Sequence, residues 1–286
     1  MLQNIIPQRR RDLGGMQVGR VLPAPERRMV GPFIFFDHMG PLHLPAGLPR
    51  STDIRPHPHI GLSTVTYLLS GEMMHRDSLG MEQPVRRGEI NWMTAGRGIT
   101  HSERFEKARA QGDDLHGLQA WVALPNAFEE TDPAFTHYDA QELLTIEERG
   151  VWMRLLAGEA FGLRSAVATH SPLFYVHWEL QAGARVQLPA AYSERAFYVV
   201  AGAVESAAGR HEAGNLLIVT PGSDAVVTAR EPTTLMGLGG EPVGPRFIEW
   251  NFVSSSQERI EQAKADWRAG RMKLPDKDHE EFTPLP

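Results

Sequence analysis

The sequence predicts an all-β protein built from two barrels of one architecture, with a single helix near its C-terminal end. Twenty-seven glycines and 21 prolines separate short apolar runs, which is typical of strands joined by turns. Helical periodicity is almost absent before residue 256. A strand–glycine–strand block also occurs twice, and at 286 residues the chain can form two domains, each with its own core.

The expected strands are short runs of apolar and β-branched residues. The clearest of them are Ser63–Leu69, Glu89–Met93, Gly117–Leu124, Ala196–Val200 and Leu216–Val219. The one helical pattern runs from Ser256 to Arg268, where apolar residues recur at helical spacing. Serines before it offer N-caps and Gly270 offers a stop, so we expect an amphipathic helix followed by an irregular tail.

The internal repeat sets the domain organisation. The run from Tyr67 to Gly71 resembles Tyr198 to Gly202, and Gly88–Met93 resembles Gly214–Val219. Each copy reads as a strand, a glycine turn and a return strand, and a closed sheet repeated in this way leaves few exposed edges. The polar segment 125–141 is expected to be a linker. The first barrel is therefore assigned to residues 1–133, and residues 134–286 hold the second barrel, the helix and the tail.

Two pairs of metal-binding residue types, His57 with His59 and His101 with Glu103, each skip one position. Alternate side chains of a strand point to the same face, so each pair can direct both members at one point. If the two strands are neighbours, three imidazoles and a carboxylate converge into a mononuclear metal site. The second half of the chain lacks all these groups, so a metal site is expected in the first barrel only. The residues at the repeat-related positions are Leu188, Ala190, Val227 and Ala229.

Three neutral imidazoles and one carboxylate suit Fe(II), Mn(II), Co(II), Ni(II), Cu(II) or Zn(II) and disfavour Mg(II) and Ca(II). Affinity rank alone would select copper or zinc. Two further histidines, His75 and His116, are expected to be hydrogen-bonded structural residues or pocket walls rather than ligands.

Composition excludes several other classes of function. The net charge of -6 argues against sequence-independent nucleic-acid binding, and the short basic cluster Arg9–Arg11 is expected to be a solvated strand edge. The absence of cysteine excludes disulfides and thiolate chemistry. No apolar stretch approaches the length of about 18 residues that a membrane span needs, so a cytoplasmic protein without membrane contact is expected.

The motifs together resemble the pirin family, which are bicupins of the cupin superfamily. The resemblance rests on Pro56–Gly61, on His75–Asp77 and above all on Trp92–Glu103, with its T-A-G-R-G-x-x-H-x-E run, and it covers nearly the whole chain. It implies two cupin-type antiparallel β-barrels with metal in the N-terminal barrel. The sequence departs from the family at Ser63, where many pirins have a glutamate, and from the general cupin pattern at Ser51, where a glycine is usual.

The resemblance also implies a metal and an activity. In pirins the positions matching His57, His59, His101 and Glu103 bind iron or another divalent ion, so one ion per chain is expected, with Fe(II) preferred. Some bacterial relatives are quercetin 2,3-dioxygenases, which implies a flavonol and O₂ as substrates, Glu103 as general base and ring opening with loss of carbon monoxide. Other relatives are redox-dependent regulators that bind a partner protein. That alternative, and another cupin activity such as a metal-bound isomerase, both remain open.

Overall fold

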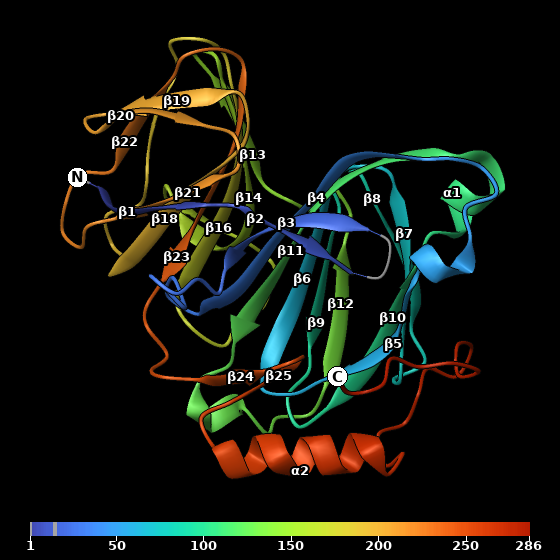
Figure 1. Cartoon of the computed structure of the whole chain (residues 1–286). Coiled ribbons are helices and arrows are strands. Elements are labelled where there is room, and N and C mark those ends of the chain that lie inside the picture. Colours follow the sequence, from blue (N-terminus) through green and yellow to red (C-terminus); the bar gives the residue numbers. More distant parts are fainter. Residues whose placement is uncertain (1, 14–15) are drawn as a thin grey trace. The chain divides into compact units, whose positions relative to one another are not determined.

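Antiparallel strands dominate the computed structural model, which describes residues 2–13 and 16–286 (Figure 1). Two α-helices are found in these residues, α1 (Glu106–Gln111) and α2 (Gln257–Arg268). The chain forms two compact units. The first unit consists of Arg11–Val18, His38–Ala140 and Gly244–Pro286, and the second of Met1–Arg10, Gly19–Asp37 and Gln141–Val243.

The strands that carry the predicted ligands belong to a four-stranded sheet of the first unit, in the order β5-β10-β7-β8. A larger sheet has the order β12-β9-β6-β11-β4-β3-β2, and a short hairpin, β24-β25, precedes α2. The strand bounds are β2 (Arg9–Asp12), β3 (Gln17–Leu22), β4 (Phe33–Leu44), β5 (Ile54–His59), β6 (Leu62–Ser70), β7 (Glu72–Asp77), β8 (Glu82–Arg86), β9 (Ile90–Thr94), β10 (Ile99–Arg104), β11 (Asp113–Ala123), β12 (Ala134–Tyr138), β24 (Phe247–Glu249) and β25 (Phe252–Ser254).

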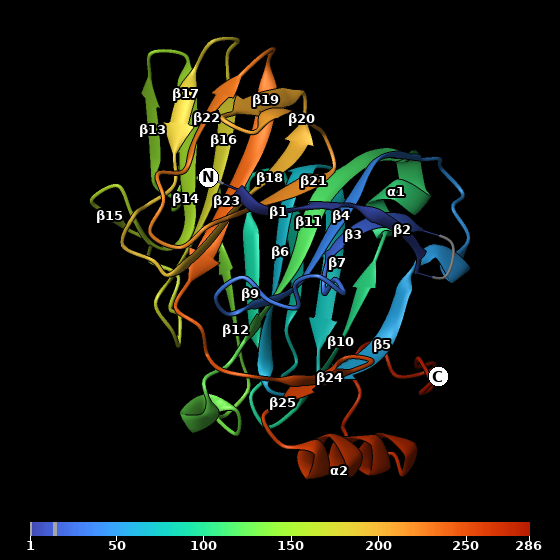
Figure 2. The same cartoon turned by 60° about the vertical axis from the view of Figure 1, so that its left-hand side comes forward.

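The second unit repeats this arrangement. Its four-stranded sheet has the order β17-β22-β19-β20, and its larger sheet the order β1-β21-β18-β23-β16-β14-β13, with β15 paired to β14 (Figure 2). The strand bounds are β1 (Leu2–Pro7), β13 (Thr145–Glu148), β14 (Val151–Ala160), β15 (Leu163–Arg164), β16 (Leu173–Leu180), β17 (Arg185–Gln187), β18 (Glu194–Ala201), β19 (Ala203–Ser206), β20 (Gly209–Glu212), β21 (Asn215–Val219), β22 (Val226–Ala229) and β23 (Thr233–Gly240). The predicted fold class and the predicted repeat are therefore confirmed.

The repeat-related positions of the second unit are filled by an apolar core. Val227 and Ala229 on β22 are buried in a cluster of aliphatic and aromatic side chains, together with Leu188, whereas Ala190 is exposed. Val227 pairs with Val186 in the same way that His101 pairs with His57. Val186 is thus the structural counterpart of His57. The sequence repeat aligns His57 with Leu188 instead, two residues further along the chain, because it does not take the pairing of the strands into account.

Helix α2 follows the sequence prediction closely. The side chain of Ser256 caps its first turn by accepting a hydrogen bond from the backbone N–H of Arg259 at 3.3 Å. Its buried residues Ile260, Ala263 and Trp267 pack in one apolar cluster with Ile60, the residue directly after His59. The helix thereby supports the end of the strand that carries two of the predicted ligands.

The prediction that residues 125–141 form a linker is wrong. Ala134–Tyr138 is strand β12, which pairs with β9 and extends the larger sheet of the first unit. The segment looks like a linker because most of its residues are polar, but all five residues of β12 pair with β9, and Phe135 and His137 lie on the same face of the sheet.

The sequence predicts the C-terminal helix as part of the second domain. In the structure α2 belongs to the first compact unit, to which the chain returns after Val243. The expected division between residues 133 and 134 stays a prediction. Neither helix in the described part of the chain has the length and apolar character needed to cross a lipid bilayer.

Candidate metal centre

The antiparallel pairing of β5 with β10 brings the three predicted histidines together. His101 lies opposite His57, and Ile99 lies opposite His59, so the three imidazoles share one face of the strand pair. Their ring centroids are 4.4 Å (His57–His101), 4.9 Å (His57–His59) and 5.0 Å (His59–His101) apart. One ligand atom from each ring lies within 4.8 Å of the other two, and all three residues are buried.

Backbone carbonyls fix the orientation of two of these rings. Nδ1 of His57 is 2.9 Å from the carbonyl oxygen of Arg55, and Nδ1 of His59 is 3.0 Å from that of Asn251. A carbonyl only accepts hydrogen bonds, so each Nδ1 carries the proton and each Nε2 keeps its lone pair. This tautomer is the one that a metal-binding histidine needs when it coordinates through Nε2.

Three buried polar atoms without hydrogen-bond partners belong to this cluster and to Glu103 beside it. Nε2 of His59, Nε2 of His101 and Oε2 of Glu103 are buried and have no hydrogen-bond partner. Unsatisfied buried nitrogen and oxygen acceptors are costly, and three of them close together are relieved by a positive ion. The residues present therefore fit a divalent metal with nitrogen and oxygen ligands.

Glu103 lies beside the histidine cluster, although it is not one of the three residues whose ligand atoms converge. Its Oε1 is 3.5 Å from Nδ1 of His101. Between His101 and Glu103 the pairing of β10 with β5 shifts register, so Glu103 lies opposite Ile54. Burial raises the pKa of the Glu103 carboxyl to about 8, an effect that the charge of Arg104 partly opposes. A bound cation would favour the ionised form.

The pKa values of the three histidines are shifted downward, and burial is again the main cause. Burial lowers the pKa of His57 to about 4, and it lowers the pKa of His59 and His101 well below their usual value. The neighbouring imidazoles lower the pKa of His59 and His101 further. All three rings are neutral at pH 7, which is the form that binds metals.

Aromatic side chains of the larger sheet adjoin the histidines. Trp121 of β11 meets His59 edge-to-face at 5.0 Å, and Phe135 of β12 stacks on His75 at 4.4 Å. No motif in the sequence places these two aromatic residues beside the histidines, and only their alternation within paired strands does so. The carbonyl of Asn251 leaves no signal in the sequence, because every residue has one.

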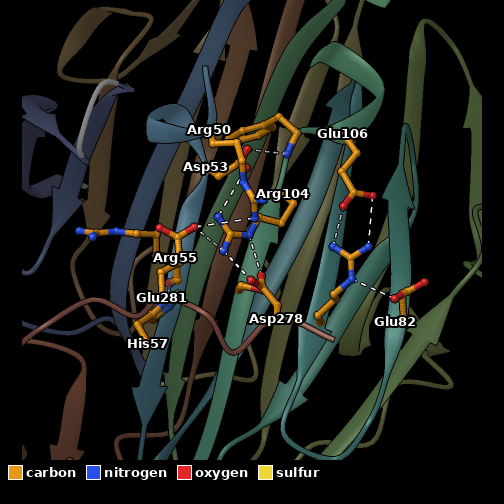
Figure 3. A network of polar contacts seen from close by, with 12 residues as sticks. Arg50, Asp53, Arg55, His57, Glu82, Arg104, Glu106, Asp278 and Glu281 are labelled. Atoms are coloured by element: carbon orange, nitrogen blue, oxygen red, sulfur yellow. Dashed lines mark hydrogen bonds and ion pairs between the residues drawn. The ribbon is translucent and has the colours of Figure 1, made fainter. Parts of the chain in front are cut away.

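The outer side of β10 is held by the C-terminal tail. Ser102 and Arg104 alternate with His101 and Glu103, and both donate hydrogen bonds of 2.6 Å to the carboxylate of Asp278. Figure 3 shows Arg104 between Asp53, Asp278 and Glu281. This buried network holds one face of the strand, while the other face carries His101 and Glu103.

Ser63, the position where many pirins have a glutamate, does not face the histidines. Its neighbour Thr64 pairs with Trp121, the residue that contacts His59, so alternation directs Ser63 to the opposite face of β6. Its hydroxyl is 3.0 Å from the hydroxyl of Thr94 in a buried position.

A second group of metal-binding residue types occurs on β12 and at the adjoining ends of β9 and β12. Glu89, His137 and Asp139 bring one ligand atom each within 4.8 Å of one another. Unlike the histidine cluster, this group is partly open to solvent, and the carboxylate of Glu89 already accepts a 2.7 Å hydrogen bond from the backbone N–H of Arg86. Nε2 of His137 lies 3.7 Å from the carboxylate of Glu89 and 3.3 Å from that of Asp139, so contacts within the group account for it without a metal.

Two barrels of this topology, with three converging histidines in one of them, define a bicupin that has a candidate metal site. Comparison with known proteins gives the family. The pirin family model matches residues 15–122 and the model of the pirin C-terminal cupin domain matches residues 175–273. The chain belongs to the pirin family.

Individual relatives agree with this assignment. A pirin-like protein of Caulobacter vibrioides is 59% identical over 100% of both chains. A Pseudomonas aeruginosa protein named "Putative quercetin 2,3-dioxygenase" is 35% identical over 94% of this chain and 84% of its own. The crystal structure of quercetin 2,3-dioxygenase from Acinetobacter baumannii superposes with a TM-score of 0.90 at 31% identity, covering 99% of this chain and 94% of that one.

Proposed function

We propose that this protein is a metal-dependent dioxygenase of the quercetinase type, which opens the central ring of a flavonol with O₂. The observation that carries the proposal is the cluster of neutral histidines His57, His59 and His101. Nε2 of His59 and Nε2 of His101 are buried there without a hydrogen-bond partner. The names of two relatives, at 35% and 31% identity, supply the substrate class.

The proposed ligands are His57, His59, His101 and Glu103, for one divalent ion per chain, with Fe(II) preferred among the metals that suit nitrogen and oxygen donors. When bound, such an ion supplies open positions for the adjacent hydroxyl and carbonyl of a flavonol, lowers the pKa of that hydroxyl and offers redox activity toward O₂. The burial of the site excludes bulk water from these groups.

Glu103 is proposed as the general base. A bound cation favours the ionised carboxylate, and the ionised carboxylate is the form that can accept the hydroxyl proton of the substrate. The histidines hold neutral rings in fixed tautomers throughout, so they take no part in the proton transfer.

The test is a single-substrate oxidation. The protein is loaded anaerobically with Fe(II), quercetin and air are added, and flavonol absorbance, O₂ uptake and carbon monoxide are followed. We expect one O₂ consumed and one carbon monoxide released per flavonol, and activity that depends on His101 but not on His137, whose conversion to alanine is the matched control. Turnover no faster than that of His101→Ala with any of the six suitable metals would rule out the proposal.

In a second proposal, the protein binds the metal but is not an enzyme. One relative at 59% identity is named only as a pirin-like protein, and the second unit carries an apolar core where the first carries its ligands. In this alternative the metal sets the charge of a surface that binds a partner protein. Affinity capture with apo, ferrous and ferric protein tests it, and an identical set of captured proteins in all three states would contradict it.

A further inference from the structure

His75 and Asp77 lie beside His101, on the neighbouring strand β7. Strand β7 pairs with β10, so that Asp77 lies opposite His101 and His75 lies opposite Glu103. All four side chains share the inner face of this strand pair. His75 and Asp77 are both buried, and neither is one of the proposed ligands.

Asp77 is itself held in one position. Its Oδ1 accepts hydrogen bonds from the backbone N–H groups of Leu79 at 2.9 Å and Met81 at 3.1 Å. Its other oxygen, Oδ2, is 3.0 Å from Nε2 of His75. A carboxylate accepts hydrogen bonds, and Asp77 already accepts two from backbone N–H groups, so Nε2 of His75 is the donor of the third and carries the proton.

The second nitrogen of His75 therefore presents a lone pair to His101. The two Nδ1 atoms are 3.4 Å apart. Because Nδ1 of His75 can only accept, Nδ1 of His101 must be the donor, which leaves Nε2 of His101 with the lone pair that points, partnerless, into the cluster. The stacked ring of Phe135, 4.4 Å from His75 and inclined by 18°, holds the plane of the His75 ring.

We propose that Asp77 and His75 are positioning residues that fix the tautomer and orientation of His101 for metal coordination. The three histidines would then be oriented by three different acceptors: a local carbonyl for His57, the distant carbonyl of Asn251 for His59, and a carboxylate–imidazole pair for His101. This inference rests on the metal site of the proposed function, but not on dioxygenase activity.

Glu103 is the competing acceptor, since its Oε1 is 3.5 Å from the same Nδ1 of His101. The proposed role of Glu103 as a ligand removes it from that contact, whereas His75 has no other use for its lone pair. If His75 is the acceptor, Glu103→Gln leaves the proton of His101 on Nδ1.

The sharpest variant is Asp77→Asn, which preserves shape but adds an N–H donor toward Nε2 of His75. That donor favours His75 with its proton on Nδ1, which would face the N–H of His101 and push the His101 proton to Nε2. The ligand lone pair is then lost, and we expect the affinity for Zn(II) to fall about 10- to 100-fold, the usual effect of removing an outer partner of a metal ligand. His75→Gln retains an oxygen acceptor for His101, so its affinity should exceed that of His75→Leu.

The matched control is Asp37→Asn. Asp37 is as buried as Asp77, at 1% exposure, and its carboxylate is paired with Arg20 in the second unit. It should lower thermal stability without changing the affinity for Zn(II). Loss of Zn(II) affinity in both aspartate variants would mean a general folding defect and would overturn the proposal.

The direct readout is the tautomer of each ring, from long-range ¹H–¹⁵N correlation spectra of the full chain labelled at histidine, without metal and with Zn(II). We expect the proton of His75 on Nε2 and that of His101 on Nδ1, and both exchanged in metal-free Asp77→Asn. A wild-type His75 with its proton on Nδ1, or an unchanged Zn(II) affinity in Asp77→Asn, would refute the inference. Because no step uses quercetin, a protein that passes these tests yet fails to oxidise flavonols would refute only the proposed function.

Discussion

Arg104 and Asp278 form a two-bond ion pair across 174 residues of the chain. Nε and Nη2 of the guanidinium are each 2.6 Å from one oxygen of the carboxylate, and Ser102 donates a third bond of 2.6 Å (Figure 3). Ser102 and Arg104 both lie on β10, one before and one after Glu103. The C-terminal tail, which looks irregular in the sequence, is therefore joined to the strand that carries two of the four proposed ligands.

Removing the tail carboxylate should loosen this strand. Asp278→Ala leaves Arg104, which is 2% exposed, without its main partner, and breaking a buried pair costs about 3 kcal/mol. We expect a lower urea midpoint for the first unit and weaker Zn(II) binding. Asp276→Ala is the control, because Asp276 pairs with Lys273 on the surface, where ion pairs contribute less than about 1 kcal/mol. Equal losses in the two variants would contradict a specific role for Asp278.

Metal binding at pH 7 should release about one proton, and that proton should come from Glu103. With its pKa raised to about 8, this carboxyl is mostly protonated before the ion binds, whereas His57, with its pKa lowered to about 4, is already neutral. Calorimetric titration in buffers of different ionisation enthalpy measures the number. Glu103→Gln should release almost none, and a release of two or more protons would contradict the assignment.

The stability of the metal-free protein should fall as the pH rises from about 4.5 to about 8. The pKa of Glu103 is about 8 in the folded protein against an ordinary 4.5, so between these values the unfolded chain binds fewer protons than the folded one. Folding therefore loses stability from about pH 4.5 up to about pH 8. His57 acts in the opposite sense between about pH 4 and 6.5, where stability rises with pH. Glu103→Gln should remove the loss above pH 6.5 in thermal unfolding scans.

The metal should stabilise the protein and bind once per chain. A ligand at 100 times its dissociation constant adds about 2.7 kcal/mol, so chelation should lower the unfolding temperature measurably and His101→Ala should abolish the difference. Elemental analysis should give one ion per chain. A second ion that survives in His101→Ala would place it at Glu89, His137 and Asp139 and would contradict the prediction of a single site.

The departure from the family pattern at Ser63 should not affect the metal. Ser63 bonds to Thr94 on the face of β6 opposite the histidines, so Ser63→Ala should leave Zn(II) affinity within about twofold of the wild type. The orphaned hydroxyl of Thr94 should lower the free energy of unfolding by about 1 kcal/mol. A tenfold loss of Zn(II) affinity would contradict this prediction and show that Ser63 affects the metal site from the opposite face of β6.

Local patterns predicted much of this molecule because their physical causes are local. Strand runs such as Leu216–Val219, the helix capped by Ser256 and the duplicated glycine turns each depend on side chains and backbone within a few residues. The skip-one spacing of His57 with His59 likewise needs only the alternation of one strand. Strand β12 was missed because its polar residues resemble those of a loop and only pairing with β9 makes it a strand.

The sequence by itself determined the fold class, the repeat and the identity of the three clustered histidines, because periodicity and spacing are properties of neighbouring residues. Only the tertiary structure decided which atoms orient those histidines and which hold the strand that carries His101. The carbonyl of Asn251, the Asp77–His75 pair and the tail carboxylate of Asp278 all come from other segments, the first and last from far along the chain. Hydrogen bonds of this kind depend on backbone positions and ring tautomers that folding alone fixes, so no spacing in the sequence records them.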